Sequence, residues 1–385
     1  MNPASFRYVR LRSLSFLSAV LVLAACSGPS QSQTPAQSGQ KAPAALPGMP
    51  PVLDPSDIYA ADHAGKLSDT VKNFPSRIYV PNSVSDTVDV IDPATFKIVS
   101  HFPVGHQPQH VVPSWDLKRL WVLNDLGNSV TEINPATGEK GQTLPVDDPY
   151  NMYFTPDGKY AIVVAEQLQR LDFRDAQTMK LDGSIKVECK GIDHMDFTTD
   201  GRFLIASCEF ASRVVKIDVA NRKVLGYLEV NKGGMPQDVK TAPDGKVFYV
   251  ADMMANGIYL VDPDTFTRIG FIETGKGAHG LYVSRDSKML YITNRGEGSI
   301  TLLDLATRKI ATKWKIPGGG SPDMGGVSAD GKVLWLSGRY NAEVYALDTT
   351  DGHLLARIKV GKGPHGLCVY PQPGRYSLGH TGVFR

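Results

Sequence analysis

Residues 241–273 read TAPDGKVFYVADMMANGIYLVDPDTFTRIGFIE, and this stretch decides the fold of the chain. A Pro-Asp-Gly turn at residues 243–245 is followed by short runs of β-branched and aromatic residues, which are separated by further turns. One of these runs ends in Val261-Asp262-Pro263. Runs of this length and composition between turn residues are typical of antiparallel β-strands. The stretch therefore predicts three consecutive strands of an all-β unit.

The ending of that run, an aliphatic residue followed by Asp or Asn and often by Pro, recurs along the chain. Its seven occurrences are Ile91-Asp92-Pro93, Ile133-Asn134-Pro135, Leu171-Asp172, Ile217-Asp218, Val261-Asp262-Pro263, Leu303-Asp304 and Leu347-Asp348. The steps between the Asp or Asn positions are 42, 38, 46, 44, 42 and 44 residues. Such a period is typical of β-propeller blades with four strands each. The sequence thus predicts an all-β, seven-bladed β-propeller with four antiparallel strands per blade.

The two ends of the repeat array fit together. The first unit begins at residues 77–82, which align with a second strand, whereas the array ends at residues 363–370, which align with a first strand. We expect these segments to share one blade and close the ring, because an unclosed sheet leaves an unpaired edge. The propeller then spans residues 76–371 and leaves a tail at 372–385, which either drapes over a face or frays. The starts of the innermost strands and the turns between second and third strands share one face, here called the top.

Three second strands and one entry loop carry family signatures. The strands Ile78-Tyr79-Val80-Pro81-Asn82, Leu120-Trp121-Val122-Leu123-Asn124 and Leu290-Tyr291-Ile292-Thr293-Asn294 resemble the YVTN signature, and the stretch Gly361-Lys362-Gly363-Pro364-His365-Gly366-Leu367 resembles the entry loop of the same YVTN-repeat, YncE-like β-propeller family. The resemblance covers about residues 76–371 and implies the propeller fold. It implies no single activity, because structural relatives of the family range from the haem-bearing domain of nitrite reductase to quinoprotein dehydrogenase subunits, lactonases and surface-layer proteins.

The N-terminus has the features of a bacterial lipoprotein signal peptide. Three arginines within residues 7–12 precede an apolar run at 16–23, which is too short to span a bilayer comfortably. The next residues, Leu23-Ala24-Ala25-Cys26-Ser27, resemble the lipobox, in which cleavage before the Cys accompanies its lipidation. We therefore expect a signal peptide at 1–25, lipidation at Cys26 and lasting attachment to a membrane surface. The alternative is a plain secretory signal.

Residues 26–75 are expected to hold the lipidated Cys, a flexible tether and a short segment before the first blade. The tether, up to about Pro55, is rich in Ser, Gln, Pro, Ala and Gly and has few large apolar groups. The sequence therefore predicts an exported protein with a lipid anchor. The anchor would lie in the outer membrane of a Gram-negative cell, or in the outer face of the cytoplasmic membrane of a Gram-positive cell.

Polar side chains are expected at the mouth of the central channel, where the innermost strands start. The first position of the seven strands holds Gln109, Tyr150, Asp193, Gln237, His279, Asp323 and His365. The next position holds His110, Asn151, His194, Asp238, Gly280, Met324 and Gly366. Imidazoles and carboxylates bind divalent transition metals, so a metal ion or a non-covalent haem is the candidate cofactor, with His110, His194, His279 and His365 as candidate ligands. The alternative is that these groups only line a wet channel and hydrogen-bond neighbouring blades.

A second polar set follows the second strands on the same face: Asn82, Asn124, Asp125, Glu166, Glu209, Asp252, Asn294, Arg295 and Arg339. Its two arginines, with two of the histidines, are candidates to bind a small anionic ligand. The predicted ligand-binding set at the channel mouth comprises His110, Asp193, His194, Asp238, His279, Arg295, Asp323, Arg339 and His365. Cys189 and Cys208 are also assigned to the top, where a disulfide and two buried thiols are both open alternatives.

Composition and motifs narrow the classes of function. Lys and Arg number 41 against 39 Asp and Glu, so a formal net charge of +2 gives no global field that attracts nucleic acid. The sequence has no Gly-x-Ser-x-Gly, His-Glu-x-x-His, phosphate-binding glycine loop or Cys-x-x-Cys-His motif. We therefore expect a monomeric, membrane-anchored scaffold that binds an envelope protein, glycan or small ligand, rather than an enzyme. The alternative is a redox accessory or hydrolase with a metal or haem at the channel mouth.

Overall fold

The structure is a computed structural model that describes residues 45–380 and 382–385. The expected signal peptide, Cys26 and the first part of the expected tether lie outside the described residues, so these remain predictions. Among the helices of the described ranges, none has the length and apolar character needed to cross a membrane.

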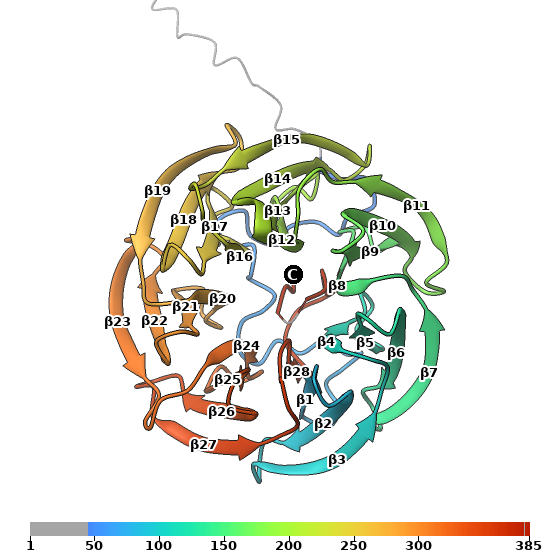
Figure 1. The fold of residues 1–385 in the computed structure, drawn as a ribbon, viewed down its shortest axis with the longest axis vertical. Coiled ribbons are helices and arrows are strands. Elements are labelled where there is room, and N and C mark those ends of the chain that lie inside the picture. Colours follow the sequence, from blue (N-terminus) through green and yellow to red (C-terminus); the bar gives the residue numbers. More distant parts are fainter. Residues whose placement is uncertain (1–44, 381) are drawn as a thin grey trace, which may run out of the picture. The chain divides into compact units, whose positions relative to one another are not determined.

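Seven four-stranded antiparallel sheets stand around a central axis, which confirms the seven-bladed propeller (Figure 1). The first blade combines β28 (Cys368–Tyr370) with β1 (Arg77–Asn82), β2 (Thr87–Asp92) and β3 (Lys97–Pro103). The second to fourth blades, each from the innermost to the outermost strand, comprise β4 (Pro108–Pro113), β5 (Leu120–Asn124), β6 (Ser129–Asn134) and β7 (Glu139–Pro145); β8 (Pro149–Phe154), β9 (Tyr160–Ala165), β10 (Arg170–Asp175) and β11 (Leu181–Lys186); and β12 (Ile192–Phe197), β13 (Phe203–Cys208), β14 (Arg213–Asp218) and β15 (Lys223–Glu229). The fifth to seventh blades comprise β16 (Pro236–Thr241), β17 (Phe248–Asp252), β18 (Gly257–Asp262) and β19 (Thr267–Glu273); β20 (Ala278–Val283), β21 (Met289–Asn294), β22 (Ser299–Asp304) and β23 (Lys309–Lys315); and β24 (Pro322–Val327), β25 (Val333–Gly338), β26 (Glu343–Asp348) and β27 (Leu354–Lys359). A short 3₁₀ helix, η1 (Glu209–Ala211), follows β13.

The ring closes where the two ends of the array meet. β28 pairs antiparallel with β1, so that Tyr79 lies opposite Cys368 and Arg77 lies opposite Tyr370. This confirms the expected closure. The first blade thereby gains its innermost strand and presents no open edge to the channel.

The core lies between neighbouring blades. In one cluster, Ile205 and Val214 of the fourth blade are buried together with Val239, Phe248 and Val250 of the fifth. Because each sheet packs against a sheet on either side, the innermost strands are held in fixed positions around the channel.

The recurring Asp or Asn ends the third strand of a blade and accepts hydrogen bonds from the turn that follows. Asp262 Oδ1 accepts from the backbone N–H groups of Asp264 and Thr265 at 2.9 and 2.8 Å. A side chain that pairs with its own backbone in this way favours a turn over a longer strand. The sequence repeat therefore marks the bottom turn of each blade.

In the third blade the residue with this role is Asp175, and the assignment of Asp172 from the sequence was wrong. Asp175 ends β10, 41 residues after Asn134 and 43 residues before Asp218, so the corrected spacing is more regular. The assignment failed because a buried Arg174 replaces the usual aliphatic residue before the turn.

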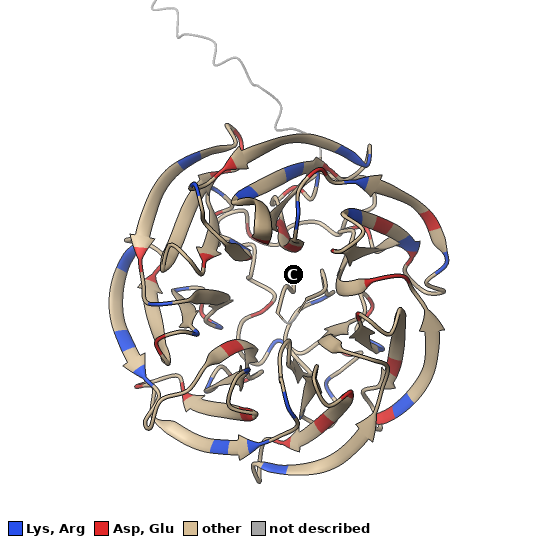
Figure 2. Cartoon of the chain, in the orientation of Figure 1, with Lys and Arg blue, Asp and Glu red and all other residues tan. Residues whose placement is uncertain are grey.

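Both signs of charge are spread around the propeller. Figure 2 shows Lys and Arg interspersed with Asp and Glu on the outer strands and in the loops. In this view neither sign of charge is confined to one part of the described ring, in keeping with the net charge of +2.

Residues 45–76 pack against the bottom face. The backbone N–H of Leu46 donates to the Asp200 carbonyl at 2.8 Å, and that of Ile58 donates to the Pro243 carbonyl at 2.9 Å. Both carbonyls belong to turns between first and second strands. The described part of the expected tether is therefore folded rather than flexible, because Leu46 and Ile58 bury their side chains against the propeller.

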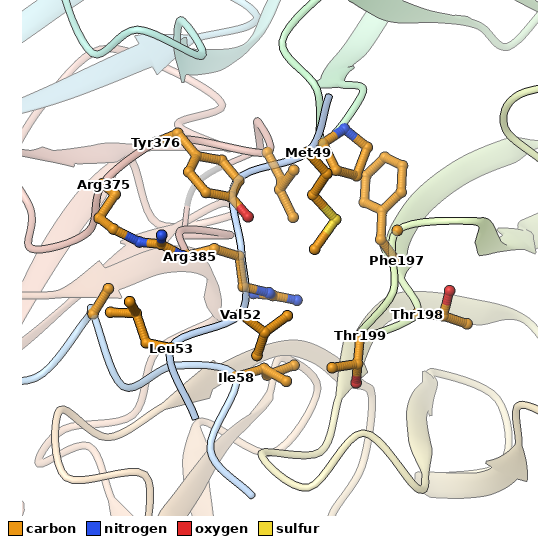
Figure 3. A pocket seen from close by; sticks show the side chains of 14 residues that line it. Met49, Val52, Leu53, Ile58, Phe197, Thr198, Thr199, Arg375, Tyr376 and Arg385 are labelled. Atoms are coloured by element: carbon orange, nitrogen blue, oxygen red, sulfur yellow. The ribbon is translucent and has the colours of Figure 1, made fainter. Parts of the chain in front are cut away.

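The tail at 372–385 turns back into the bottom of the channel instead of fraying. The Leu378 carbonyl accepts from the Phe154 N–H at 2.9 Å, and the Arg385 guanidinium donates to the Asp196 carboxylate at 2.9 Å. Figure 3 shows Met49 and Arg385 lining the same pocket. The two ends of the described chain thus close the bottom of the propeller together.

Candidate functional site

The innermost strands begin with an irregularity that brings two consecutive side chains to the channel. In β12 the pairing with β13 passes from Ile192 directly to Met195. Similar shifts occur at the start of β4, β8, β16, β20 and β24. A β-bulge leaves extra residues unpaired and re-aims their side chains. Both aligned positions, here 193 and 194, therefore serve the channel.

The four histidines expected at the mouth meet in the channel. The ring centroid of His110 lies 4.8 Å from that of His365 and 5.5 Å from that of His194. The centroid of His279 lies 6.2 Å from that of His194. Each of the four residues is at most 2% exposed, and each comes from a different blade. The fold thus assembles an imidazole cluster from residues far apart in the sequence.

A fifth imidazole, which the sequence analysis missed, comes from the tail. The ring centroid of His380 lies 4.7 Å from that of His194 and 5.3 Å from that of His110. Its backbone N–H donates to the Met152 carbonyl at 3.0 Å, and its φ of 50° lies in the left-handed region, where His is more common than most residues. The tail belongs to no blade, so no aligned position indicated where this side chain lies.

Asp323 is the centre of an ion-pair network in the channel. Its Oδ2 accepts from His365 Nδ1 at 2.7 Å, and its Oδ1 accepts from Arg295 Nη1 at 3.0 Å. His279 Nδ1 lies 3.3 Å from Oδ1, and Arg339 Nη1 lies 4.0 Å from Oδ2. Burial by itself would raise the pKa of this carboxyl, but the neighbouring His279, Arg295 and His365 hold it well below its usual range. Asp323 is therefore an anion that orients its partners.

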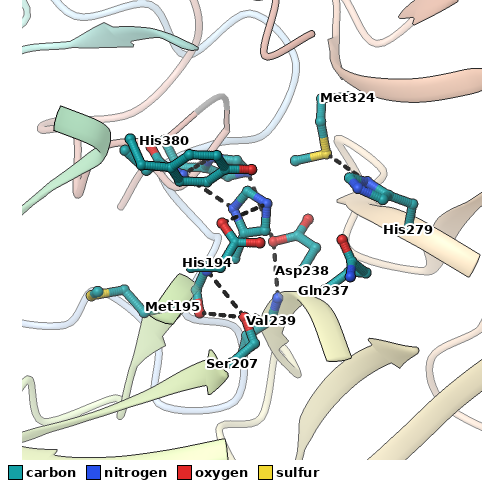
Figure 4. Close-up of polar contacts among 12 residues, drawn as sticks. His194, Met195, Ser207, Gln237, Asp238, Val239, His279, Met324 and His380 are labelled. Atoms are coloured by element: carbon teal, nitrogen blue, oxygen red, sulfur yellow. Dashed lines mark hydrogen bonds and ion pairs between the residues drawn. The ribbon is translucent and has the colours of Figure 1, made fainter. Parts of the chain in front are cut away.

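A second group of polar atoms surrounds His194 and His380 (Figure 4). The Asn151 Nδ2 lies 3.1 Å from Nδ1 of each of these two rings. The Nε2 of His194 lies 3.2 Å from Asp193 Oδ1, and the Nε2 of His380 lies 3.8 Å from Asp238 Oδ1. One nitrogen of each ring thus faces an amide, whereas the other faces a carboxylate.

Several buried atoms of this group have no hydrogen-bond partner. They are both ring nitrogens of His110, the Nε2 atoms of His194 and His380, and both carboxylate oxygens of Asp193. Burial lowers the pKa of the three imidazoles, which are therefore neutral at pH 7. A buried polar group without a partner costs about 1–3 kcal/mol. This group of unpaired polar atoms indicates a binding site for water, an ion or another ligand that is not part of the chain.

Three amides and one carboxylate that follow the second strands on the top face form hydrogen bonds within their own blades. Three amides donate through Nδ2 to a side chain of the adjacent third strand: Asn82 to Asp89 at 2.9 Å, Asn124 to Thr131 at 3.0 Å and Asn294 to Thr301 at 3.0 Å. Asp252 Oδ1 accepts from the backbone of its own turn, at Met254 and Ala255. These four residues end second strands, where the sequence placed them, and their polar atoms stabilise local strand pairs and turns.

The remaining charges make the top mouth bipolar. The Arg295 guanidinium lies 5.3 Å above the ring of Tyr340. On the opposite side of the ring, the pKa of Glu166 is raised to about 8. The largest cause is burial, and the negative charges of Glu209, Asp125 and Asp148 add to it. Acidic groups thus crowd one side of the mouth, while Arg295 occupies the other.

The free energy of unfolding of the Glu166→Gln variant, compared with that of the parent, should increase as the pH rises from about 4.5 to 8. The folded-state pKa lies above that of an unfolded Glu, so the parent loses stability as Glu166 ionises across this window, whereas the variant does not. Because the side chain is partly solvated, we expect a gain of about 1 kcal/mol. Urea denaturation at pH 5 and pH 8.5 measures it, and an equal difference at both pH values would contradict the raised pKa.

A disulfide joins Cys189 and Cys208, so the first of the two alternatives left open by the sequence is the one present. Cys189 precedes β12, and Cys208 ends β13. The bridge therefore ties the segment that leads into Asp193 and His194 to the neighbouring strand. The remaining described cysteine, Cys368, is a buried free thiol in β28.

A haem does not fit among these imidazoles, whereas a single ion does. The centroids of the His110, His194 and His380 rings lie 4.7–5.5 Å apart, so the rings are in direct contact. A porphyrin plane between any two of them would have to displace both. One ion needs only the space between three or four donor atoms.

Comparisons with known proteins agree with this architecture. A family described as YNCE-like beta-propeller matches residues 43–373. Antigen Lp49 of Leptospira interrogans is 25% identical over 338 residues, which cover 78% of this chain and 71% of that protein. The protein YncE of Salmonella typhi is 26% identical over 248 residues, which cover 57% of this chain and 69% of YncE.

Solved structures share the fold at lower identity. The periplasmic gluconolactonase PpgL of Pseudomonas aeruginosa superposes with a TM-score of 0.64 at 17% identity, over 77% of this chain and 99% of that one. The dihydro-heme d1 dehydrogenase NirN, in complex with DHE, gives 0.59 at 16% identity, over 84% of this chain and 82% of that one. At these identities the similarity establishes the fold alone.

Proposed function

The chain belongs to the YNCE-like β-propeller family, and because this fold fixes no single activity, we propose a function from the surface of the protein itself. The protein is a membrane-anchored scaffold that binds a partner protein of the cell envelope through its top face. The observation that carries this proposal is a ring of exposed apolar side chains. The turns between second and third strands carry Val84, Leu126, Leu168, Phe210, Met254 and Tyr340, which are 45–71% exposed. Only the sixth blade lacks a large apolar side chain there, since its turn contains Gly296.

Single exposed apolar residues are common, but this set recurs at one turn in six of seven blades. Apolar side chains gathered on one face are typical of interaction sites. They are spread over six blades, so a small ligand reaches few of them and a folded protein reaches many. Polar and charged groups at the mouth would then lie inside the interface.

The bottom face is less suited to a partner, because residues 45–76 and the tail already cover it. The proposed anchor at Cys26 is tested separately from the binding face. Changing Cys26 to Ser should release the protein from the membrane fraction and abolish its labelling by a radioactive fatty acid.

Photocrosslinking in living cells tests the binding face. A photoreactive amino acid in place of Phe210 or Tyr340 should give one and the same protein adduct, identified by mass spectrometry. The matched controls are Leu225 and Ile310 on the outermost strands β15 and β23, which are 48% and 45% exposed. The adduct should disappear when Leu168 and Met254 are both changed to Lys. Equal adducts from the control positions, or none from the top face, would refute the proposal.

A further inference from the structure

Three donor atoms converge beneath the top mouth. One nitrogen each of His194 and His380 and one carboxylate oxygen of Asp238 all lie within 4.8 Å of one another (Figure 4). All three side chains are at most 1% exposed. They come from the fourth blade, the tail and the fifth blade, so only the closed fold with its inserted tail brings them together.

The donor atoms keep lone pairs for a ligand. Each oxygen of Asp238 accepts one backbone N–H, from Val239 at 2.9 Å and from Leu281 at 2.8 Å, and retains a second lone pair. The Nε2 atoms of His194 and His380 have no hydrogen-bond partner, and neither does either nitrogen of the adjacent His110. The three rings lie together, with centroids 4.7–5.5 Å apart, and an unprotonated ring nitrogen offers a lone pair to a cation. The Asp238 carboxylate places an oxygen within 4.8 Å of the nitrogens of His194 and His380 and supplies the negative charge that a cation needs.

We propose that His194, Asp238 and His380 bind one divalent transition-metal ion, with His110 as the fourth side chain. This site is independent of the partner protein proposed above. Two or three imidazoles with one carboxylate suit zinc, copper or cobalt, whereas magnesium and calcium prefer oxygen ligands throughout. The site differs from the four histidines expected from the sequence, because His279 and His365 are already engaged by Asp323.

Neighbouring residues make room for the ion and orient its ligands. A side chain at Gly366 would place its Cβ 2.0 Å from His110 Nδ1, so glycine is needed there for the imidazole to fit. Asn151 bridges Nδ1 of His194 and His380. An imidazole that binds a metal through Nε2 carries its proton on Nδ1 and needs an acceptor there. Rotation of the Asn151 amide would supply Oδ1 as this acceptor and would break the 2.8 Å hydrogen bond that Oδ1 now accepts from the Met152 N–H.

Metal titration of the full-length protein tests the site. The protein in detergent is stripped with a chelator, dialysed and titrated with Zn²⁺ and Co²⁺ by calorimetry, and bound metal is counted by mass spectrometry. We expect one ion per chain. Changing His380 to Asn, which tolerates the left-handed backbone, should weaken binding at least about 100-fold, and Asp238→Asn, which keeps the shape of the side chain, should weaken it clearly.

Two matched histidines serve as controls. His279→Gln should change the affinity less than about threefold, because this ring is held by Asp323, and His106→Gln, whose ring is exposed beside Asp86, should change nothing. Circular dichroism and thermal melting verify that each variant is folded. The proposal is wrong if no stoichiometric metal binds, which leaves a channel filled with water, or if His380→Asn binds as tightly as His106→Gln. Neither result would affect crosslinking from the top face, so the two proposals fail separately.

Discussion

Changing Asp323 to Asn is expected to lower the free energy of unfolding by about 3–5 kcal/mol, as is typical when one partner of a buried ion pair is removed. The side chain is fully buried and its carboxylate accepts from His365 and Arg295. Without the negative charge, Arg295 remains a buried cation and its desolvation is no longer compensated. Chemical denaturation at pH 7 measures the loss.

The matched control is Asp147→Asn, which removes an ion pair with Arg170 from a carboxylate that is 67% exposed. This change should cost less than about 1 kcal/mol. The pH dependence gives a second check. Since the folded-state pKa of Asp323 is depressed, its contribution is present above about pH 4, where an unfolded Asp ionises, and is lost as the pH falls further. A difference between parent and Asp323→Asn that grows below pH 4 would contradict the network.

Deleting residues 367–385 is expected to abolish cooperative folding. The deletion removes β28, and with it the buried side chains of Leu367, Val369 and Tyr370. Each is worth roughly 1.5–3 kcal/mol when fully buried. Their sum is comparable to the 5–15 kcal/mol by which a typical native protein is stable. Differential scanning calorimetry and size-exclusion chromatography should find no sharp transition and no compact monomer.

A shorter deletion separates the ring from its tail. Removing residues 375–385 keeps β28 and its pairing with β1, so the protein should still unfold in one cooperative transition, at a lower temperature because Tyr376, Leu378 and Phe384 are lost from the core. If both deletions gave the same broad transition, closure by β28 would not be the decisive contact. If neither changed the transition, the ring would not depend on its C-terminal end.

The sequence predicted the blade number, the closure and the channel positions, because each depends on a repeated local pattern. The turn that Asp262 stabilises recurs in the other blades, and so does an Asp or Asn at the equivalent position. The innermost strands likewise start with a bulge, which brings positions such as His194 and His279 to the channel. Repetition averages out local exceptions. The one error in the repeat, Asp172 for Asp175, arose where Arg174 breaks the aliphatic pattern.

What the sequence did not predict lies outside the repeat. His380 belongs to a tail whose path is set by contacts with Met152 and Phe154 in the third blade, and no local pattern encodes such long-range contacts. Residues 45–55 look like a tether by composition, yet a few apolar side chains such as Leu46 suffice to fold them once the propeller offers a surface. The proposed metal site combines both cases, because His110, His194 and Asp238 occupy repeat positions whereas His380 comes from the tail.

Anomalous diffraction from crystals soaked in zinc tests most directly whether the tail completes a functional channel. Data collected on the two sides of the zinc absorption edge should show one strong peak between His194, Asp238 and His380. The peak should be missing from crystals of the His380→Asn variant. A zinc peak only at surface residues such as His106 would show that the channel does not bind a metal. The same conclusion would follow if a water occupied the channel site while surface sites in the same crystal were fully occupied by zinc.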